Sequence, residues 1–155
     1  MIKEKILTLL KENRIQFTLT HHAPATTSAD SARERGESIK IGAKALMLKT
    51  DKGYFLAVLP ADRRLDSSAY RKLVKARKIR FATKNELIQL TGLVPGAVPP
   101  FGEIISIPML VDKALFEEEY MAFNAGTLTD SVKMKTADFN RIVSPNTGSF
   151  SKQNT

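Results

Sequence analysis

Two neighbouring apolar runs constrain the fold of this chain more than any other feature of its sequence. The runs are Ala43–Thr50 and Gly53–Leu59, and Asp51-Lys52-Gly53 joins them. Both runs are apolar at both alternating sets of positions, which is typical of strands that are covered on both faces. A short link with glycine is typical of a hairpin turn. The sequence therefore predicts a buried antiparallel hairpin at the centre of a sheet.

Short helices and strands are expected around this hairpin. Spacing and capping residues predict helices at Ile2–Asn13, Ser28–Arg35 (capped by Thr26-Thr27-Ser28), Ser67–Arg77, Thr83–Leu90 and Ala137–Ile142, with a helical turn at Asp112–Glu118. Further strands are predicted at residues 15–20, 78–82, 103–108, 120–124 and 131–135. We expect an α+β fold with a mixed, partly barrel-like sheet flanked by helices. It forms one domain over residues 1–143, followed by a polar, frayed tail over residues 144–155.

The composition excludes several classes of site. The chain has no cysteine, so disulfides, thiolate zinc sites, iron–sulfur clusters and a cysteine nucleophile are excluded. The two histidines, His21 and His22, are adjacent, which argues against a multi-histidine metal site. No apolar run reaches the roughly 18 residues of a membrane span, and no targeting segment is recognisable. We expect a cytoplasmic protein with no metal, no cofactor and no membrane partner.

The excess positive charge lies in one segment. The formal charge is +8, and residues 61–84 carry +7 of it, because nine basic and two acidic residues lie there. In the helix expected at Ser67–Arg77, an apolar stripe of Ala69, Leu73 and Ala76 opposes a basic stripe. Two interpretations stay open, a solvated surface helix and an anion-binding surface for a nucleic-acid backbone. The candidate RNA-binding residues are Arg63, Arg64, Arg71, Lys72, Lys75 and Lys78.

Lys44 is the first residue that suggests chemistry. In a strand it shares a face with Leu46 and Leu48. A lysine in that position lies either at the rim of the sheet or in a pocket, and the sequence leaves both open. In a pocket it would hold an anion or polarise a carbonyl group, and partial burial would lower its pKa.

The segment Gly92–Gly102 (GLVPGAVPPFG) is the second. Three glycines and three prolines in eleven residues predict a stiff loop whose backbone a ligand can approach closely. Such a loop either is a structural turn or presents free N–H groups to a phosphate, carboxylate or oxyanion. It is not a P-loop, because no Gly-Lys-Ser/Thr follows.

Two further candidates are weaker when taken alone. His22, Ser28 and Asp30 can be combined into a triad, but no G-x-S-x-G motif supports it. Asn124, in the sequence FNAG, closes a strand and is either a turn residue or a site residue.

Together these segments resemble a known family. The order is HAPATTSAD from His22, GAKAL from Gly42, LAVLPADRRLD from Leu56, TGLVPGAVPPFG from Thr91 and FNAG from Phe123. It resembles the YbaK/prolyl-tRNA-synthetase-associated domain family, the free-standing relatives of an editing domain inserted in that synthetase. The resemblance covers residues 17–142, and the GxxPGxxxPFG loop is its most specific part.

The resemblance implies a trans-editing deacylase. Such an enzyme hydrolyses the ester between a wrong amino acid and the 3′ end of tRNA, here most plausibly alanine or cysteine on tRNA(Pro). It implies tRNA as the partner, prolyl-tRNA synthetase as a second partner, and no DNA. Two alternatives stay open: a tRNA- or synthetase-binding module without catalysis, and a hydrolase of another activated ester.

The resemblance also implies roles for individual residues. Lys44 matches the family's functional lysine, which contacts the terminal nucleotide or substrate and is not a covalent nucleophile. The main chain around Gly96 meets the aminoacyl carbonyl group, so the two catalytic candidates are Lys44 and Gly96. The candidate substrate-binding residues are His22, Thr27, Ala97, Pro100, Phe101, Gly102 and Asn124. Residues 63–84 would hold the phosphates of the acceptor stem.

Overall fold

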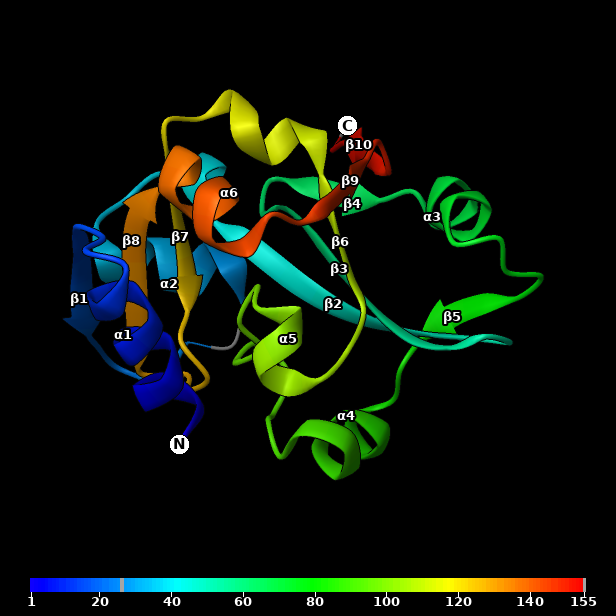
Figure 1. The fold of residues 1–155 in the computed structure, drawn as a ribbon, viewed down its shortest axis with the longest axis horizontal. Helices are drawn as coiled ribbons and strands as arrows, with labels where there is room; N and C mark the ends of the chain where they lie inside the picture. Colours follow the sequence, from blue (N-terminus) through cyan, green and yellow to red (C-terminus); the bar gives the residue numbers. More distant parts are fainter. Residues whose placement is uncertain (26, 155) are drawn as a thin grey trace.

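The computed structural model describes residues 1–25 and 27–154, so Thr26 of the predicted helix cap and Thr155 of the predicted tail lie outside the described residues. The helices are α1 (Ile2–Glu12), α2 (Ser28–Arg35), α3 (Ser67–Leu73), α4 (Lys84–Thr91), α5 (Gly102–Ile105) and α6 (Thr136–Val143), with 3-10 turns at Ile39–Ile41 and Lys113–Glu117 (Figure 1). The strands are β1 (Phe17–His21), β2 (Ala43–Thr50), β3 (Gly53–Pro60), β4 (Arg63–Leu65), β5 (Ile79–Phe81), β6 (Met109–Asp112), β7 (Tyr120–Asn124), β8 (Asp130–Lys135), β9 (Asn146–Gly148) and β10 (Ser151–Gln153).

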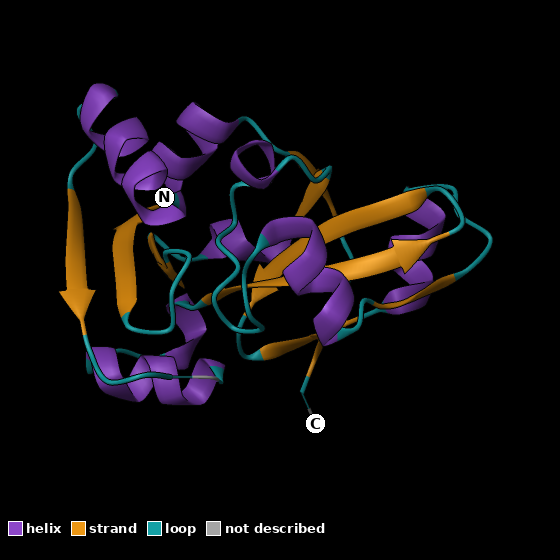
Figure 2. Cartoon of the chain, turned by 90° about the horizontal axis from the view of Figure 1, so that it is seen from below, coloured by secondary structure: helices purple, strands orange, loops and turns teal. Residues whose placement is uncertain are grey.

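The strands form three sheets within the described residues. A five-stranded mixed sheet has the order β5-β2-β3-β6-β9, an antiparallel sheet has the order β1-β8-β7, and β10 pairs with β4. The predicted hairpin is confirmed, because β2 and β3 pair from Thr50–Gly53 to Ala43–Pro60 at the centre of the largest sheet. The α+β class is also confirmed, and the sheets do not close into a barrel. In Figures 1 and 2 the hairpin extends to one end of the molecule, away from β1, β7 and β8.

Strand β2 separates two hydrophobic clusters. Ala43 and Met47 belong to the larger cluster, which β7, β8 and helices α1 and α6 complete. Leu48 belongs to the smaller one, where it meets Tyr70 and Phe150. Both faces of β2 are therefore covered, as the unbroken apolar pattern predicts. No helix in the part of the chain that is described is long and apolar enough to cross a membrane.

The segment after the proline-rich loop differs from the prediction. The strand expected at residues 103–108 is wrong, because Gly102–Ile105 forms α5 and the next strand begins at Met109. Gly102 explains the turn, since a Cβ there would lie 2.8 Å from the Cβ of Met109. Only glycine allows this close return of the chain. The isoleucines of residues 103–108 fit the pattern of a strand, but this steric requirement decides the local structure.

The basic helix is also shorter than predicted. It ends at Leu73, and Lys75 adopts a left-handed backbone conformation with φ of 59°. Its fully buried residue is Tyr70, whereas Leu73 keeps 43% of its surface exposed. The apolar stripe expected from Ala69, Leu73 and Ala76 is therefore corrected to a face centred on Tyr70.

The expectation of a frayed C-terminal tail is wrong for the described residues. Strand β9 runs parallel to β6, and β10 runs antiparallel to β4. Phe150 lies between them, 1% exposed, with its ring 4.9 Å from that of Tyr70. The buried carboxylate of Asp112 accepts hydrogen bonds from the Phe150 N–H and the Ser151 hydroxyl. One aromatic residue and one carboxylate thus anchor a polar segment.

Candidate functional site

One half of β2 has an open edge. Residues of an antiparallel strand alternate between hydrogen bonding to one neighbour and pointing their peptide groups to the other side. The Ala61 N–H donates to the Gly42 carbonyl and the Ala82 N–H donates to the Met47 carbonyl, so the odd-numbered residues of β2 face away from β3. Strand β5 covers that side only from Leu48 to Thr50. The peptide groups of Ala45 therefore face a side where no strand of the described residues pairs with them.

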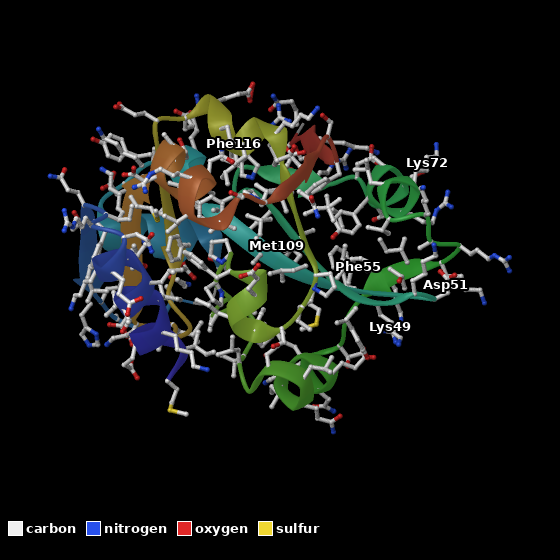
Figure 3. The ribbon with its side chains drawn as sticks, in the orientation of Figure 1. Lys49, Asp51, Phe55, Lys72, Met109 and Phe116 are labelled. Atoms are coloured by element: carbon white, nitrogen blue, oxygen red, sulfur yellow. The ribbon has the colours of Figure 1, made fainter. Side chains whose placement is uncertain are left out.

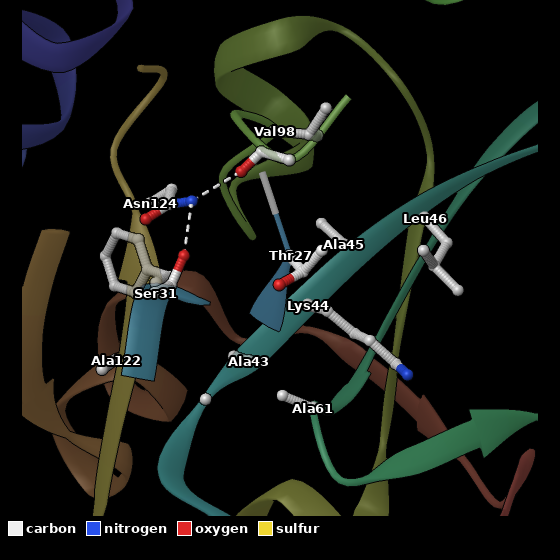
Figure 4. A pocket seen from close by; sticks show the side chains of 13 residues that line it. Thr27, Ser31, Ala43, Lys44, Ala45, Leu46, Ala61, Val98, Ala122 and Asn124 are labelled. Carbon is white, nitrogen blue, oxygen red and sulfur yellow. Dashed lines mark hydrogen bonds between the residues drawn. The ribbon is translucent and has the colours of Figure 1, made fainter. Parts of the chain in front are cut away.

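A pocket of about 170 Å³ lies at this open edge (Figure 4). Strand β2 forms one wall, β7 another, and the loop before α5 a third. Four residues proposed from the sequence line it: Lys44, Gly96, Thr27 and Asn124. The other lining residues are small or apolar for the most part: Ser31, Gly42, Ala43, Ala45, Leu46, Ala61, Val98, Ala122 and Phe123.

Lys44 lies at the edge of this pocket and is half-buried. Its Nζ donates a hydrogen bond to the backbone carbonyl of Arg63 in β4. Burial lowers the pKa of Lys44, and the nearby carboxylate of Asp62 partly opposes this effect. The sequence left open whether Lys44 lies at the rim of the sheet or in a pocket. In the structure it lies at the rim of the pocket and directs its charge toward β4.

The loop around Gly96 presents backbone groups to the pocket. Gly96 has φ of 90°, a conformation that favours glycine. The Ala97 N–H closes a turn on the Val94 carbonyl, and the Ala97 carbonyl accepts from the Gly126 N–H. The N–H groups of Gly96 and Val98 donate to no other described residue, and both residues line the pocket.

Asn124 connects this loop to the far wall. Its Nδ2 donates to the Gly96 carbonyl at 2.7 Å and lies 3.3 Å from the Ser31 hydroxyl (Figure 4). Its Oδ1 accepts from the Ser131 hydroxyl at 2.9 Å, and His22 Nε2 lies 2.7 Å from that hydroxyl. His22 therefore touches the pocket only through other residues.

The same contacts decide the weak triad hypothesis. His22 faces Ser131 and not the helix of Asp30, whose carboxylate pairs with Arg33. Ser131 is 1% exposed and donates its proton to Asn124, so it has no access to a substrate carbon. This pair has the residue types of a hydrolase but not the exposure that a nucleophile needs.

Five of the seven predicted substrate-binding residues do not line the pocket: His22, Ala97, Pro100, Phe101 and Gly102. Pro100, Phe101 and Ala97 are buried, and Phe101, 3% exposed, packs edge-on against Phe123 and Phe139. Gly102 begins α5 beneath Met109. The last four of these residues support the loop from behind, and the contact of all five with substrate stays a prediction.

Sequence analysis also missed residues of the site. Ser31 lies on α2 and Ser131 on β8, and both contact Asn124. A lone serine in a helix or strand carries no signal in one sequence, and only the folded chain brings these two to the same amide.

The predicted basic residues separate into two groups. Arg63 and Arg64 lie in β4, beside the carbonyl that binds Lys44. The others, Arg71, Lys72, Lys75 and Lys78, lie in and after α3, near the tip of the hairpin, where Figure 3 labels Lys72 and Asp51. The two groups lie on consecutive elements, β4 and α3, and Arg64 and Arg71 are seven residues apart in the sequence. No group of three or more metal-ligating His, Asp or Glu side chains occurs within residues 1–25 and 27–154.

Comparison with known proteins identifies the family that shares this sequence and fold. A family model described as the aminoacyl-tRNA editing domain matches residues 22–142. The chain is 34% identical to the multifunctional Ser/Thr-tRNA deacylase ProXp-y of Escherichia coli K12, over 95% of this chain and 91% of that protein. It is 27% identical to the prolyl-tRNA editing protein ProX of Acetoanaerobium sticklandii, over 96% and 94% of the two chains.

Solved structures agree on the fold. A hypothetical protein, APE2540, superposes with a TM-score of 0.86 at 23% identity, covering 96% of this chain and 99% of that one. A candidate trans-editing enzyme for prolyl-tRNA synthetase superposes with a TM-score of 0.80 at 21% identity, covering 97% and 96%. The resemblance noted in the sequence is thereby confirmed, and the chain belongs to the aminoacyl-tRNA editing domain family.

Proposed function

We propose that this protein hydrolyses the aminoacyl ester of mischarged tRNA in trans, and that the pocket at the open edge of β2 is its active site. One observation carries the proposal. The unpaired N–H groups of Gly96 and Val98 and the cation of Lys44 border one small pocket. Family membership and two relatives named as editing proteins support the enzyme class, an aminoacyl-tRNA deacylase.

The proposed chemistry needs few groups. An aminoacyl ester is already activated, so a positioned water molecule or a ribose hydroxyl can attack it. The negative charge that develops on the carbonyl oxygen would be stabilised by the N–H groups of Gly96 and Val98. Lys44 would bind the terminal nucleotide, because its Nζ is directed to the β4 side of the pocket. No cofactor or metal takes part in this proposal.

The pocket favours a small amino acid. Its volume is about 170 Å³, and alanines 43, 45, 61 and 122 give part of it an apolar lining without polar groups for a larger polar side chain. A second, small sieve removes residues that a synthetase admits because they are smaller than its own substrate. We therefore propose alanine or cysteine on tRNA(Pro) as the substrate.

A second candidate substrate class is serine or threonine. Thr27, Ser31 and Asn124 give one wall of the pocket two hydroxyl groups and an amide. A site that hydrogen-bonds a substrate hydroxyl discriminates strongly against an analogue without it. The ProXp-y relative, which is named for serine and threonine, points the same way.

We propose tRNA as the partner that explains the basic residues. Arg63 and Arg64 would contact the 3′ end beside the pocket, while Arg71, Lys72, Lys75 and Lys78 would contact acceptor-stem phosphates at the tip. Prolyl-tRNA synthetase is a second proposed partner, and neither DNA nor a membrane has a role. The proposal assigns the editing activity to one domain, which includes the C-terminal strands β9 and β10 beyond the predicted boundary at residue 143, and places it in the cytoplasm, where tRNA is charged.

A deacylation panel tests the proposal. The protein is incubated with tRNA(Pro) carrying alanine, cysteine, serine, threonine or proline, and with the same amino acids on a second tRNA. We expect release of alanine or cysteine from tRNA(Pro) and retention of proline. Preferential release of serine and threonine would select the second class. Salt-sensitive binding of tRNA without turnover of any ester would overturn the enzyme and support the binding-module alternative.

A further inference from the structure

A hydrogen-bonded chain of three side chains leads from the protein surface to the Gly96 loop. We propose that Ser131 and His22 are positioning residues that orient Asn124 and, through it, the Gly96 carbonyl, and that this chain is complete only when both ring nitrogens of His22 carry a proton. The inference rests on the proposed function, because the Gly96 loop matters only if it contacts the substrate. It adds two residues and a pH dependence to that site.

The orientation of Asn124 is the first step. The Gly96 carbonyl can only accept a hydrogen bond, and the nearest amide atom of Asn124 lies 2.7 Å from it. That atom must be Nδ2, since a reversed amide would place two acceptor oxygens against each other. Oδ1 must then face Ser131, at 2.9 Å.

The direction of the remaining bonds follows from the first. Oδ1 of Asn124 accepts only, so the single proton of the Ser131 hydroxyl points to it. The hydroxyl can then only accept from His22, at 2.7 Å, which requires a proton on Nε2. His22 Nδ1 lies 2.8 Å from the Ala23 carbonyl, another pure acceptor, which requires a proton on Nδ1. Both requirements are met only by the imidazolium form.

A neutral His22 breaks the chain at one of two places. With the proton on Nδ1, Ser131 must turn its proton toward His22 and release Asn124. With the proton on Nε2, two lone pairs meet at the Ala23 carbonyl. The first tautomer therefore frees the Asn124 amide, and the second disfavours the ring orientation that holds Ser131, because an unmet acceptor pair is unfavourable. Either change loosens the Gly96 loop.

Neighbouring charged groups are engaged with one another. His21 Nδ1 lies 3.0 Å from Asp130 Oδ1, which also lies 3.5 Å from Lys3 Nζ. Burial raises the pKa of Asp130, but the hydrogen bonds from His21 and Thr127 and the charge of Lys3 outweigh this effect and lower it. Lys133 pairs with Glu37 at 3.0 Å. These groups occupy α1, β1, β8 and the segment after α2, which leaves the protonation of His22 as the variable in this chain.

The consequence is a pH dependence of the deacylation rate in addition to the intrinsic pH dependence of ester hydrolysis. The loop should be better ordered at acidic pH, because only the doubly protonated ring satisfies both Ser131 and the Ala23 carbonyl. Misplacement of a reacting group by about 1 Å costs about 100-fold in rate, so a smaller shift of the loop still lowers the rate measurably.

Three variants test the inference through rate ratios, which cancel the intrinsic pH dependence of the ester. His22→Gln keeps a donor for Ser131 at every pH and removes the nitrogen that faces Ala23. Ser131→Ala removes the connection, and Ser131→Thr keeps the hydroxyl. We expect the wild-type rate divided by the His22→Gln rate to fall about tenfold between about pH 5.5 and 8. The Ser131→Ala rate divided by the His22→Gln rate should be low and should not change with pH. The corresponding ratio for Ser131→Thr should again fall as the pH rises.

A second measurement does not depend on activity. The side-chain amide resonances of Asn124, followed by NMR, should shift with pH in the wild type and stay constant in Ser131→Ala. If the wild type shows these shifts but hydrolyses no ester, the proposed function fails and the positioning chain stands. If the Asn124 resonances do not respond to pH, or if wild type and Ser131→Ala give parallel rate profiles, the inference is overturned.

Discussion

The two halves of β2 have the same neighbour on one side and different surroundings on the other. From Leu48 to Thr50 the strand is paired on both edges, by β3 and by β5. From Lys44 to Leu46 only β3 pairs with it, and the free edge faces the pocket and the Gly96 loop. One continuous strand thus supplies a closed structural half and an open half with unsatisfied backbone groups.

In the closed half, two carboxylates near β2 are hydrogen-bonded within the protein. The carboxylate of Glu86 accepts from both guanidinium nitrogens of Arg80, from the Thr83 N–H and from the Tyr54 hydroxyl. The Asp51 carboxylate accepts the N–H groups of the two residues before β5. Both of these carboxylates are therefore engaged in structural hydrogen bonds. This contrast supports our proposal that the active site lies at the open edge of β2.

The largest effect should come from comparing one lysine in each half. Lys44→Ala should lower deacylation by roughly 10²–10³-fold, the loss typical for one preorganised charged or donor group. Lys49→Ala, in the closed half, removes only a contact with the Tyr54 ring, so its rate should stay near that of the wild type. Single-turnover deacylation measures both, and circular dichroism checks that both remain folded. Equal rates for the two variants would contradict the division of the strand.

A smaller effect should follow from the charges at the tip. Changing Lys72, Lys75 and Lys78 to Glu together should raise the KM for tRNA about tenfold and leave kcat unchanged, because phosphate contacts add binding without touching the ester. The slope of log Kd against log salt should also fall by about 2–3.

Its matched control changes three exposed lysines outside the tip by the same total charge, Lys5, Lys11 and Lys113. If the control raises KM as much as the tip variant does, the effect comes from net charge and the tip is not a specific RNA surface.

The smallest effect should be a pH-dependent loss of stability at Glu86. Hydrogen bonds from Arg80, Thr83 and Tyr54 hold the pKa of Glu86 well below its ordinary value of 4.5. Its stabilising contribution is therefore complete above that value and is lost as the pH falls below it. We expect Glu86→Gln to lower Tm by about 2 °C near pH 6, with the difference from wild type shrinking toward about pH 3.

Glu117→Gln serves as the control for that measurement. Glu117 is exposed and makes no ion pair with any described residue, so its substitution should leave Tm unchanged at both pH values. Deacylation by Glu86→Gln should equal that of the wild type. A loss of activity there would show that the closed half takes part in catalysis.

Much of the fold and part of the site could be predicted from the sequence. The apolar pattern of β2 and β3 identified the central hairpin, because both faces of a covered strand must be apolar. The capping box of Thr83 and Glu86 marked the start of α4 within one residue. Lys44 was identifiable because a cation that shares a strand face with two leucines conflicts with burial.

The remainder depended on contacts between distant residues. Phe150 fixes the C-terminal segment through a pocket formed by Tyr70, 80 residues away in sequence, and nothing local signals that pairing. Ser31 and Ser131 became site residues only because α2 and β8 approach Asn124. The strand expected after the loop failed because the steric need at Gly102 comes from Met109, which lies beyond the segment.

Strand β2 fixes the distance between the turn of the hairpin and the pocket. The eight residues of β2 are paired with β3 along their whole length, so the strand cannot shorten or bend independently. Lys44 and Thr50 are six residues apart, which fixes roughly 20 Å between the pocket and the turn of the hairpin. If tRNA binds as we propose, a stem held near this turn would bring to Lys44 only an end of matching length, whatever its base sequence.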